Sequence, residues 1–111
     1  MADIIQMTTP LLEMEVDVDC TGADEISLTF EQGNRQVLRL DKADLTVTST
    51  KISHKFTQLE SGRFYPDIIV KGQLKALIGS DVYANDMKEN PILLDVSRIL
   101  DTREFGGSGD G

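Results

Sequence analysis

The sequence has little of the residue types that build disulfides, zinc sites or catalytic pairs. Among its 111 residues there is one cysteine, Cys20, and one histidine, His54. A single cysteine excludes an internal disulfide and a cysteine-rich zinc site, and a single histidine excludes any site that needs two. Tryptophan is absent and aromatic residues make up 5% of the chain. The core must therefore be built largely from Leu, Ile and Val.

Basic residues are also scarce. Eleven Lys and Arg stand against 19 Asp and Glu, which gives a formal net charge of -8. This charge repels phosphate backbones and anionic membrane surfaces, so we expect neither nucleic acid nor a membrane as a partner. No apolar run approaches the ~20 residues of a transmembrane helix. Residues 1–12 contain Asp3 and neither Lys nor Arg, so they do not predict a secretory signal, and we expect the chain to be cytoplasmic when it is made.

The hydrophobic residues, 40% of the chain, are spaced mostly two apart. Alternate side chains of a strand face opposite sides, whereas a helix repeats every 3.6 residues. Leu12, Met14 and Val16 alternate with Glu13 and Glu15, which is typical of a strand with one buried face. The pattern predicts seven or eight short strands, over residues 12–18, 26–31, 37–40, 45–48, 51–56, 68–76, 82–86 and 92–96.

The links between these strands carry turn residues. Gly33 and Asn34 tolerate positive φ and predict a hairpin. Residues 57–62 break the alternation and end at glycine, so they predict one helical turn that crosses between sheets. Gly72 interrupts the longest strand and indicates a bulge or a close backbone approach. Short strands at this spacing, without a long amphipathic helix, favour an antiparallel β-sandwich.

We therefore expect one all-β domain, since 111 residues match a single domain of ordinary size. The predicted antiparallel sandwich covers residues 11–97, with seven or eight short strands and at most one short helical turn. Residues 1–10 are predicted to form an N-terminal arm. Residues 98–111 are predicted to form a C-terminal tail, Gly-rich and flexible from residue 106.

An acidic row invites comparison with a calcium site. Asp17, Asp19 and Gly22 match positions one, three and six of the EF-hand loop, but position five is Thr21 and the acid expected at position twelve is Leu28. The match fails where the ligands are required. We interpret the row as the solvent face of a strand and predict no metal site.

No pattern indicates catalysis. His54 falls on the apolar side of its strand, as expected of a core or interface histidine with a satisfied nitrogen and not of a ligand or a base. Cys20 lies in a turn between Asp19 and Asp24, whose charge raises a thiol pKa and disfavours a nucleophile. No G-x-S-x-G elbow is present. We expect no enzyme activity, no catalytic residues and no cofactor.

Two aromatic residues stand together near Pro66. Phe64 and Tyr65 could form a loop that stacks on a sugar or binds a partner, and the alternative is that they close one end of the sandwich. Our candidate partner interface consists of Phe64, Tyr65, Tyr83, Arg98, Ile99 and Leu100.

The order of the motifs extends this interpretation. A strand reading ISLTFEQG, a crossing HKFTQLES, a strand IVKGQLKAL, the stretch YAND and an ending LDVSRIL follow one another between Ile5 and Asp101. This order resembles a family of small proteins encoded in the tail modules of phages and prophages of Gram-positive bacteria. The loop over residues 87–91 is longer than the family's usual link.

The resemblance implies an immunoglobulin-like β-sandwich similar to the amino-terminal domain of phage upper-baseplate proteins. It implies a structural role in a tail or baseplate, with other phage structural proteins as partners and a homo-oligomer in the assembled particle. The protein would reside in the host cytoplasm during assembly and then in the virion. The tail after Ile99 would extend onto a neighbouring subunit.

Two other functions remain open from the sequence. A capsid decoration protein would share the same small β fold. A carbohydrate- or calcium-binding module would use Tyr65, Tyr83 and the acidic turn.

Overall fold

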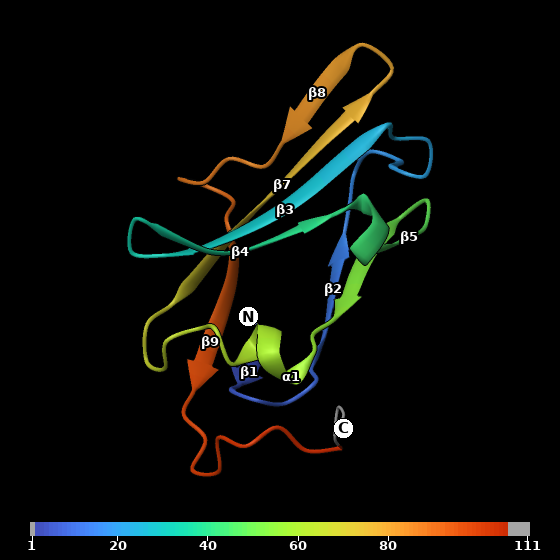
Figure 1. Ribbon diagram of the computed structural model, residues 1–111. Coiled ribbons are helices and arrows are strands. Elements are labelled where there is room, and N and C mark those ends of the chain that lie inside the picture. The colour runs from blue at the N-terminus through green and yellow to red at the C-terminus, as the bar shows by residue number, and fades with distance from the viewer. Residues whose placement is uncertain (1, 107–111) are drawn as a thin grey trace.

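The computed structural model describes residues 2–106 and is predominantly β (Figure 1). Within these residues there are nine strands and two short helical turns. In chain order they are β1 (Ala2–Ile5), β2 (Leu11–Glu15), β3 (Glu25–Gln32), β4 (Arg35–Asp41), η1 (Lys42–Asp44), β5 (Thr46–Val47), β6 (Lys51–Lys55), α1 (Gln58–Ser61), β7 (Val70–Ile78), β8 (Asp81–Ala84) and β9 (Ile92–Ser97). The predicted all-β class is confirmed.

The strands form two sheets. The larger has the order β1-β9-β7-β3-β4, with β8 also paired to β7, and the smaller has the order β2-β6-β5. One edge of β7 pairs with β3, so β8 and β9 share its other edge. There β9 pairs with Val70 to Gly72, and β8 pairs with Lys75 to Ile78. The β7–β8 hairpin projects at one end of the molecule, and α1 lies toward the other (Figure 1).

The core lies between the two sheets, because each sheet buries alternate residues. The burial of β3 shows this most plainly, with Ile26, Leu28, Phe30 and Gln32 all buried. From the smaller sheet, Leu12 and Ile52 are buried against them. The hairpin at Gly33, with φ of 63°, and the helical turn ending at Gly62 occur where the sequence predicted them.

The N-terminal segment differs from the prediction. Residues 1–10 were expected to be an arm outside the sandwich, yet β1 is an edge strand that pairs in parallel with β9. Ile4 is 1% exposed and belongs to the core. The segment has no alternation because apolar Ile4 and Ile5 are adjacent, so its sequence carries no strand period. The larger sheet is therefore mixed and not wholly antiparallel, and it begins before residue 11.

A second helical turn was also not expected. Residues Lys42–Asp44 form η1, where the sequence analysis allowed one helical turn in all. Asp41 and Asp44 form a capping box in which the Asp44 carboxylate accepts from the Asp41 backbone N–H at 3.0 Å. This local pairing competes with strand extension and ends β4.

Gly72 marks a close approach of side chains. A Cβ at this position would lie 3.1 Å from the Phe30 ring and 3.2 Å from the Ile92 Cβ. The register shift of the larger sheet falls elsewhere, in the β3–β4 pairing between Phe30 and Glu31. The sequence predicted a bulge or a close backbone approach at Gly72, and the structure shows neither: the β3–β7 and β7–β9 registers are unshifted at this residue, and the atoms nearest to it belong to side chains.

Neither helical turn in residues 2–106 has the length and apolar character needed to cross a membrane. Up to residue 106 the predicted tail contains bends but neither helix nor strand, and most of its predicted flexible end lies outside the described residues.

Candidate functional site

One half of the core is closed by three phenylalanines. The rings of Phe30, Phe56 and Phe64 form mutual contacts, with centroid separations of 5.8 to 6.0 Å and tilted or edge-to-face geometry. Phe64 is 1% exposed, so it cannot be a partner-contacting residue in the folded protein. This corrects its place in the predicted interface. The alternative considered for it, closure of one end of the sandwich, is what the structure shows.

A buried glutamine holds the loop beside this aromatic cluster. Gln32 is 6% exposed. Its side-chain amide donates to the Tyr65 carbonyl at 2.8 Å and to the Ile68 carbonyl at 2.9 Å, and its oxygen accepts from the Tyr65 N–H at 2.7 Å. All of its side-chain groups are used in fixing the loop that follows Phe64. The Tyr65 ring itself is 49% exposed.

His54 is similarly satisfied. Its Nδ1 lies 2.9 Å from the Asp44 carbonyl oxygen, and its Nε2 lies 2.9 Å from the Glu60 carboxylate. Both partners are acceptors, so the ring nitrogen that carries the hydrogen has a partner to donate to in either tautomer. Glu60 also accepts from the Thr57 N–H as half of the α1 capping box. The predicted role of His54 as a satisfied, packed histidine is confirmed.

The other half of the core is built from smaller residues. Its buried members are Cys20, Ala23, Ile26, Ile52 and Ala76. Burial raises the pKa of the Cys20 thiol, and the neighbouring Asp19 carboxylate adds to the rise. A thiol in this setting is held in its protonated form, which is a poor nucleophile.

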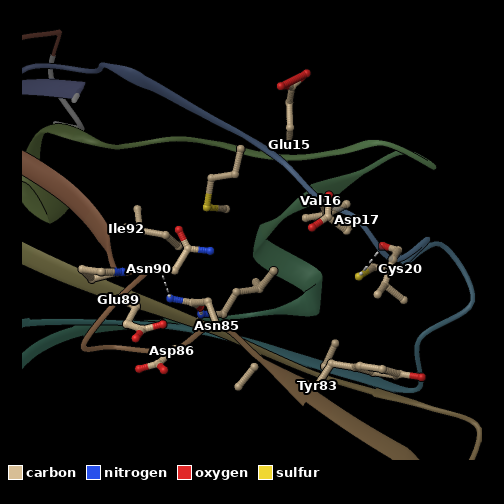
Figure 2. Close-up of a pocket in the computed structure, with 16 residues that line it drawn as sticks. Glu15, Val16, Asp17, Cys20, Tyr83, Asn85, Asp86, Glu89, Asn90 and Ile92 are labelled. Atoms are coloured by element: carbon tan, nitrogen blue, oxygen red, sulfur yellow. Dashed lines mark hydrogen bonds between the residues drawn. The ribbon is translucent and has the colours of Figure 1, made fainter.

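A groove opens beside this small-residue half (Figure 2). Its volume is about 590 Å³. All four residues of β8 are exposed, so the inner side of that strand is not covered by the three-stranded sheet. Tyr83 pairs with buried Ala76, and directly paired residues share a sheet face, so the Tyr83 ring faces the groove. The apolar lining includes Met14, Val16, Leu74, Ala76, Pro91 and Ile92.

Asn85 builds one wall of the groove. Its side-chain oxygen accepts from the Leu74 N–H at 2.7 Å, and its amide donates to the Gly72 carbonyl at 3.3 Å and the Asn90 carbonyl at 3.0 Å. It thereby satisfies β7 backbone groups at the point where β8 has ended and β9 has not begun. Figure 2 shows the Asn85–Asn90 link at the centre of the pocket. Asn85 lies in the YAND stretch, which by itself indicates no role for this side chain.

The charged residues of the groove lining are all acidic. Glu15 and Asp17 come from the β2 side, and Asp86 and Glu89 come from the loop between β8 and β9. In Figure 2 the Glu15 side chain extends away from the apolar floor. The groove thus combines an apolar floor with an acidic rim on two sides.

The β2 edge bordering the groove is unpaired within residues 2–106, where β6 is the only neighbour of β2. Hydrogen bonds from Phe56 N to Pro10 O and from Val16 N to Thr50 O mark the even-numbered β2 positions as facing β6. Antiparallel pairing alternates by residue. The backbone N–H and C=O groups of Leu11, Glu13 and Glu15 therefore point outward, away from β6.

The acidic turn next to the groove is internally bonded. Asp19 Oδ1 accepts from the Thr21 hydroxyl at 2.7 Å and from the Thr21 N–H at 2.9 Å. These bonds, the side-chain bond first, hold the pKa of Asp19 below its ordinary value. Among the described residues, no group of three His, Cys, Asp or Glu side chains is arranged to hold a metal ion.

The predicted interface residues do not form one surface. Tyr83, 43% exposed, belongs to the groove, whereas Tyr65 sits beside Gln32 at the opposite end of β3. The remaining three, Arg98, Ile99 and Leu100, follow β9, where Leu100 is 88% exposed.

The segment after Leu100 lies back on α1. Gln58 donates to the Phe105 carbonyl at 2.6 Å and accepts from the Phe105 N–H at 2.7 Å. Pairing through a sheet edge was a candidate binding mode from the sequence, but the groove and the identity of the edge beside it were not predicted, because both depend on which strands lack a neighbour. Comparison with known proteins provides no further guide: no family model matches the chain, and no curated protein matches it.

Proposed function

We propose that this protein is a structural component of a phage particle, in the tail or baseplate, and that it acts by binding other proteins. The phage assignment is carried by the order of motifs between Ile5 and Asp101 that resembles the tail-module family. The protein would be made in the host cytoplasm and assembled into the virion with other phage structural proteins, in several copies.

The observation that carries the binding role is the unpaired β2 edge beside an open groove. Soluble proteins normally cover or blunt such edges, because free backbone groups pair readily with another chain. An edge with an adjoining groove is a recurrent place for one protein to hold an extended segment of another. No separate cluster of nucleophile and base competes with this interpretation among the described side chains, and we propose no enzymatic activity.

We further propose that the sandwich is of the immunoglobulin-like type. In that fold the third, sixth and seventh strands share one sheet, and the second, fourth and fifth share the other. When β4 and β8 are set aside as additions, β3, β7 and β9 are adjacent in one sheet, and β2, β6 and β5 make up the other. This order supports the proposal. The parallel pairing of β1 with β9 is a departure from the simplest seven-strand form.

The glycan- or calcium-binding alternative receives less support from the geometry. Tyr65 is beside Gln32, and Tyr83 is next to Ala76, which pairs with Ile26. Gln32 is six residue steps along β3 from Ile26, or roughly 20 Å. The two tyrosines are therefore too far apart to stack on one sugar.

Fractionation of the particles tests the location. Phage from the source culture would be separated on a density gradient into heads and tails, and the chain identified in each fraction by mass spectrometry. We expect stoichiometric recovery with tails. Recovery with heads would replace the proposal with capsid decoration, and absence from both fractions would exclude a structural role in the particle.

A further inference from the structure

The β2 edge offers an ordered set of backbone groups. The outward N–H and C=O groups of Leu11, Glu13 and Glu15 lie on alternate residues of a five-residue strand. A chain laid alongside at strand spacing, roughly 4.8 Å away, meets these groups in register. It needs only an extended backbone to form their hydrogen bonds.

The side chains around this edge define the two faces of such an added strand. On the inner face lies the apolar groove floor, including Met14, Leu74 and the Tyr83 ring. On the outer face lie the exposed Glu13 and Glu15 side chains. Because successive residues of a strand alternate between faces, an added strand would place one set of side chains on the floor and the other beside the two glutamates.

The charges around the groove indicate which side chains the added strand should carry on its outer face. Glu15, Asp17, Asp86 and Glu89 flank the groove, and among residues 2–106 no Lys or Arg lines it. An incoming segment carrying Lys or Arg is attracted from both sides, whereas an acidic one is repelled. The volume of about 590 Å³ is within the roughly 300–1,000 Å³ typical of clefts that bury ligand groups, so there is room for several aliphatic side chains.

A second copy of this chain is a poor occupant. Two β2 edges paired with each other would bring Glu13 and Glu15 against like charges, which is destabilising. Each copy carries a net charge of -8, so association through this acidic side adds further repulsion. The edge is therefore suited to a different protein of opposite charge.

We propose that the β2 edge and the adjoining groove bind an extended segment of a partner protein in which Lys or Arg alternates with aliphatic residues. The segment adds as a strand to β2, with its aliphatic side chains on Leu74 and Tyr83 and its basic side chains beside Glu13 and Glu15. This inference rests on the protein-binding part of the proposed function and not on the phage location. Particle fractionation and peptide binding can therefore fail separately.

The test uses synthetic peptides with the full-length protein. The probe is an eight-residue peptide of alternating Lys and Val, and its controls are Glu-Val and Lys-Ser peptides of equal length. A fourth peptide has the Lys-Val sequence with N-methyl groups on alternate residues, which removes backbone donors without changing side chains or charge. Binding is measured by fluorescence anisotropy at low salt, and the contact surface is mapped by amide NMR shifts.

We expect the Lys-Val peptide to bind at least about tenfold more tightly than each control, a difference of the size produced by losing one or two hydrogen bonds or reversing the charge. The largest amide shifts should fall on Leu11, Glu13 and Glu15. Equal binding by the N-methylated peptide, shifts centred on the β4 edge, or no binding at millimolar peptide would overturn the proposal.

Two variants with matched controls locate the site independently. Glu13→Pro removes an outward N–H without breaking a bond to β6, and Glu13→Gln loses the same charge but keeps that N–H. Glu15→Lys reverses a rim charge, and Asp95→Lys makes the same change on exposed β9 away from the groove. The first member of each pair should weaken Lys-Val binding about fivefold relative to its control. Equal effects within both pairs would contradict the assigned edge.

Thermal unfolding of each variant accompanies the binding measurement. If Glu13→Pro fails to fold, the N-methylated peptide reports on the same backbone bonds with the protein unchanged.

Discussion

The two halves of the core lie between the same two sheets, but one half is closed at its end of the sandwich and the other opens into a groove. Around Phe30, Phe56 and Phe64 the sandwich is filled by aromatic rings and closed by Gln32, which uses every polar atom of its side chain. Around Cys20 and Ala76 the buried residues include no aromatic ring, and the edge of the sandwich opens into a groove. The aromatic rings close one end of the fold, and the end that we propose for binding lies beside the smaller residues.

The difference follows from strand count as well as from side-chain size. The larger sheet continues through β8, but the smaller sheet has three strands and leaves β8 uncovered. At the aromatic end, the loop after α1 folds over the core. Thr8 and the wholly buried Ser61 form two hydrogen bonds there, at 2.7 and 3.1 Å. The closed end can hold the sandwich together while the open end remains available to a partner.

The largest expected effect tests the aromatic half. Phe64→Ala removes a ring packed against Phe30 and Phe56, and we expect it to lower the free energy of unfolding by about 3 to 5 kcal/mol. Chemical denaturation measures this loss. Tyr65→Ala is the control, since its ring is half exposed and its truncation should cost far less. Equal losses of stability for the two variants would contradict the placement of Phe64 in the core.

Truncation of the buried glutamine should have the next largest effect. Gln32→Ala leaves the Tyr65 N–H and the Tyr65 and Ile68 carbonyls without their partner, and we expect a loss of about 2 to 3 kcal/mol. Gln36→Ala, on the exposed side of β4, is the matched control and should change stability by less than about 0.5 kcal/mol. If the hydrogen bonds of Gln32 do not stabilise the fold, the Gln32→Ala and Gln36→Ala variants will have the same melting temperature.

The open half depends on Asn85 in a comparable way. Asn85→Ala leaves the Leu74 N–H unsatisfied and releases the loop that carries Asp86 and Glu89, at an expected cost of about 1 to 2 kcal/mol. The variant should also weaken Lys-Val peptide binding, because Asp86 and Glu89 are no longer held beside the groove. Asn90 contributes to this link through its backbone carbonyl, so Asn90→Ala serves as the control. A loss of stability with unchanged peptide affinity would show that the loop between β8 and β9 is not part of the binding site.

The smallest effect concerns the acidic turn. Hydrogen bonds from Thr21 lower the pKa of Asp19 in the folded state. The stabilisation is therefore present above the unfolded-state pKa and is lost as the pH falls through the lower folded-state value. Asp19→Asn should melt slightly below the parent protein at pH 7, and the difference should shrink as the solution is acidified toward pH 2. A difference that grows on acidification would have the wrong sign for this turn.

Much of the fold could be predicted from the sequence, because alternation is a local property. The strands around Leu28, Leu74 and Leu94, the Gly33 hairpin and the turn ending at Gly62 all follow from neighbouring residues. Pairing partners are not local. Adjacent Ile4 and Ile5 contain no period of two, and only their alignment with β9 makes a strand of them.

The same distinction explains the candidate site. His54 was placed correctly because its own strand shows which side is apolar. Phe64 and Tyr65 are neighbours in sequence, and the sequence alone could not assign one ring to the core and the other to the surface. The groove arises because, among the described residues, no strand of the smaller sheet covers β8. The sequence of β8 itself does not show whether another strand will pack on it.

Amide hydrogen exchange resolved by residue tests the central claim most directly, which is that the β2 edge is the binding edge. In the free protein, the outward amides of Leu11, Glu13 and Glu15 should exchange rapidly, while the inward amides of Leu12 and Met14 should be protected by β6. With saturating Lys-Val peptide, the outward amides should become protected as well. Protection of these amides in the free protein, or their unchanged exchange once the peptide is bound, would contradict the account.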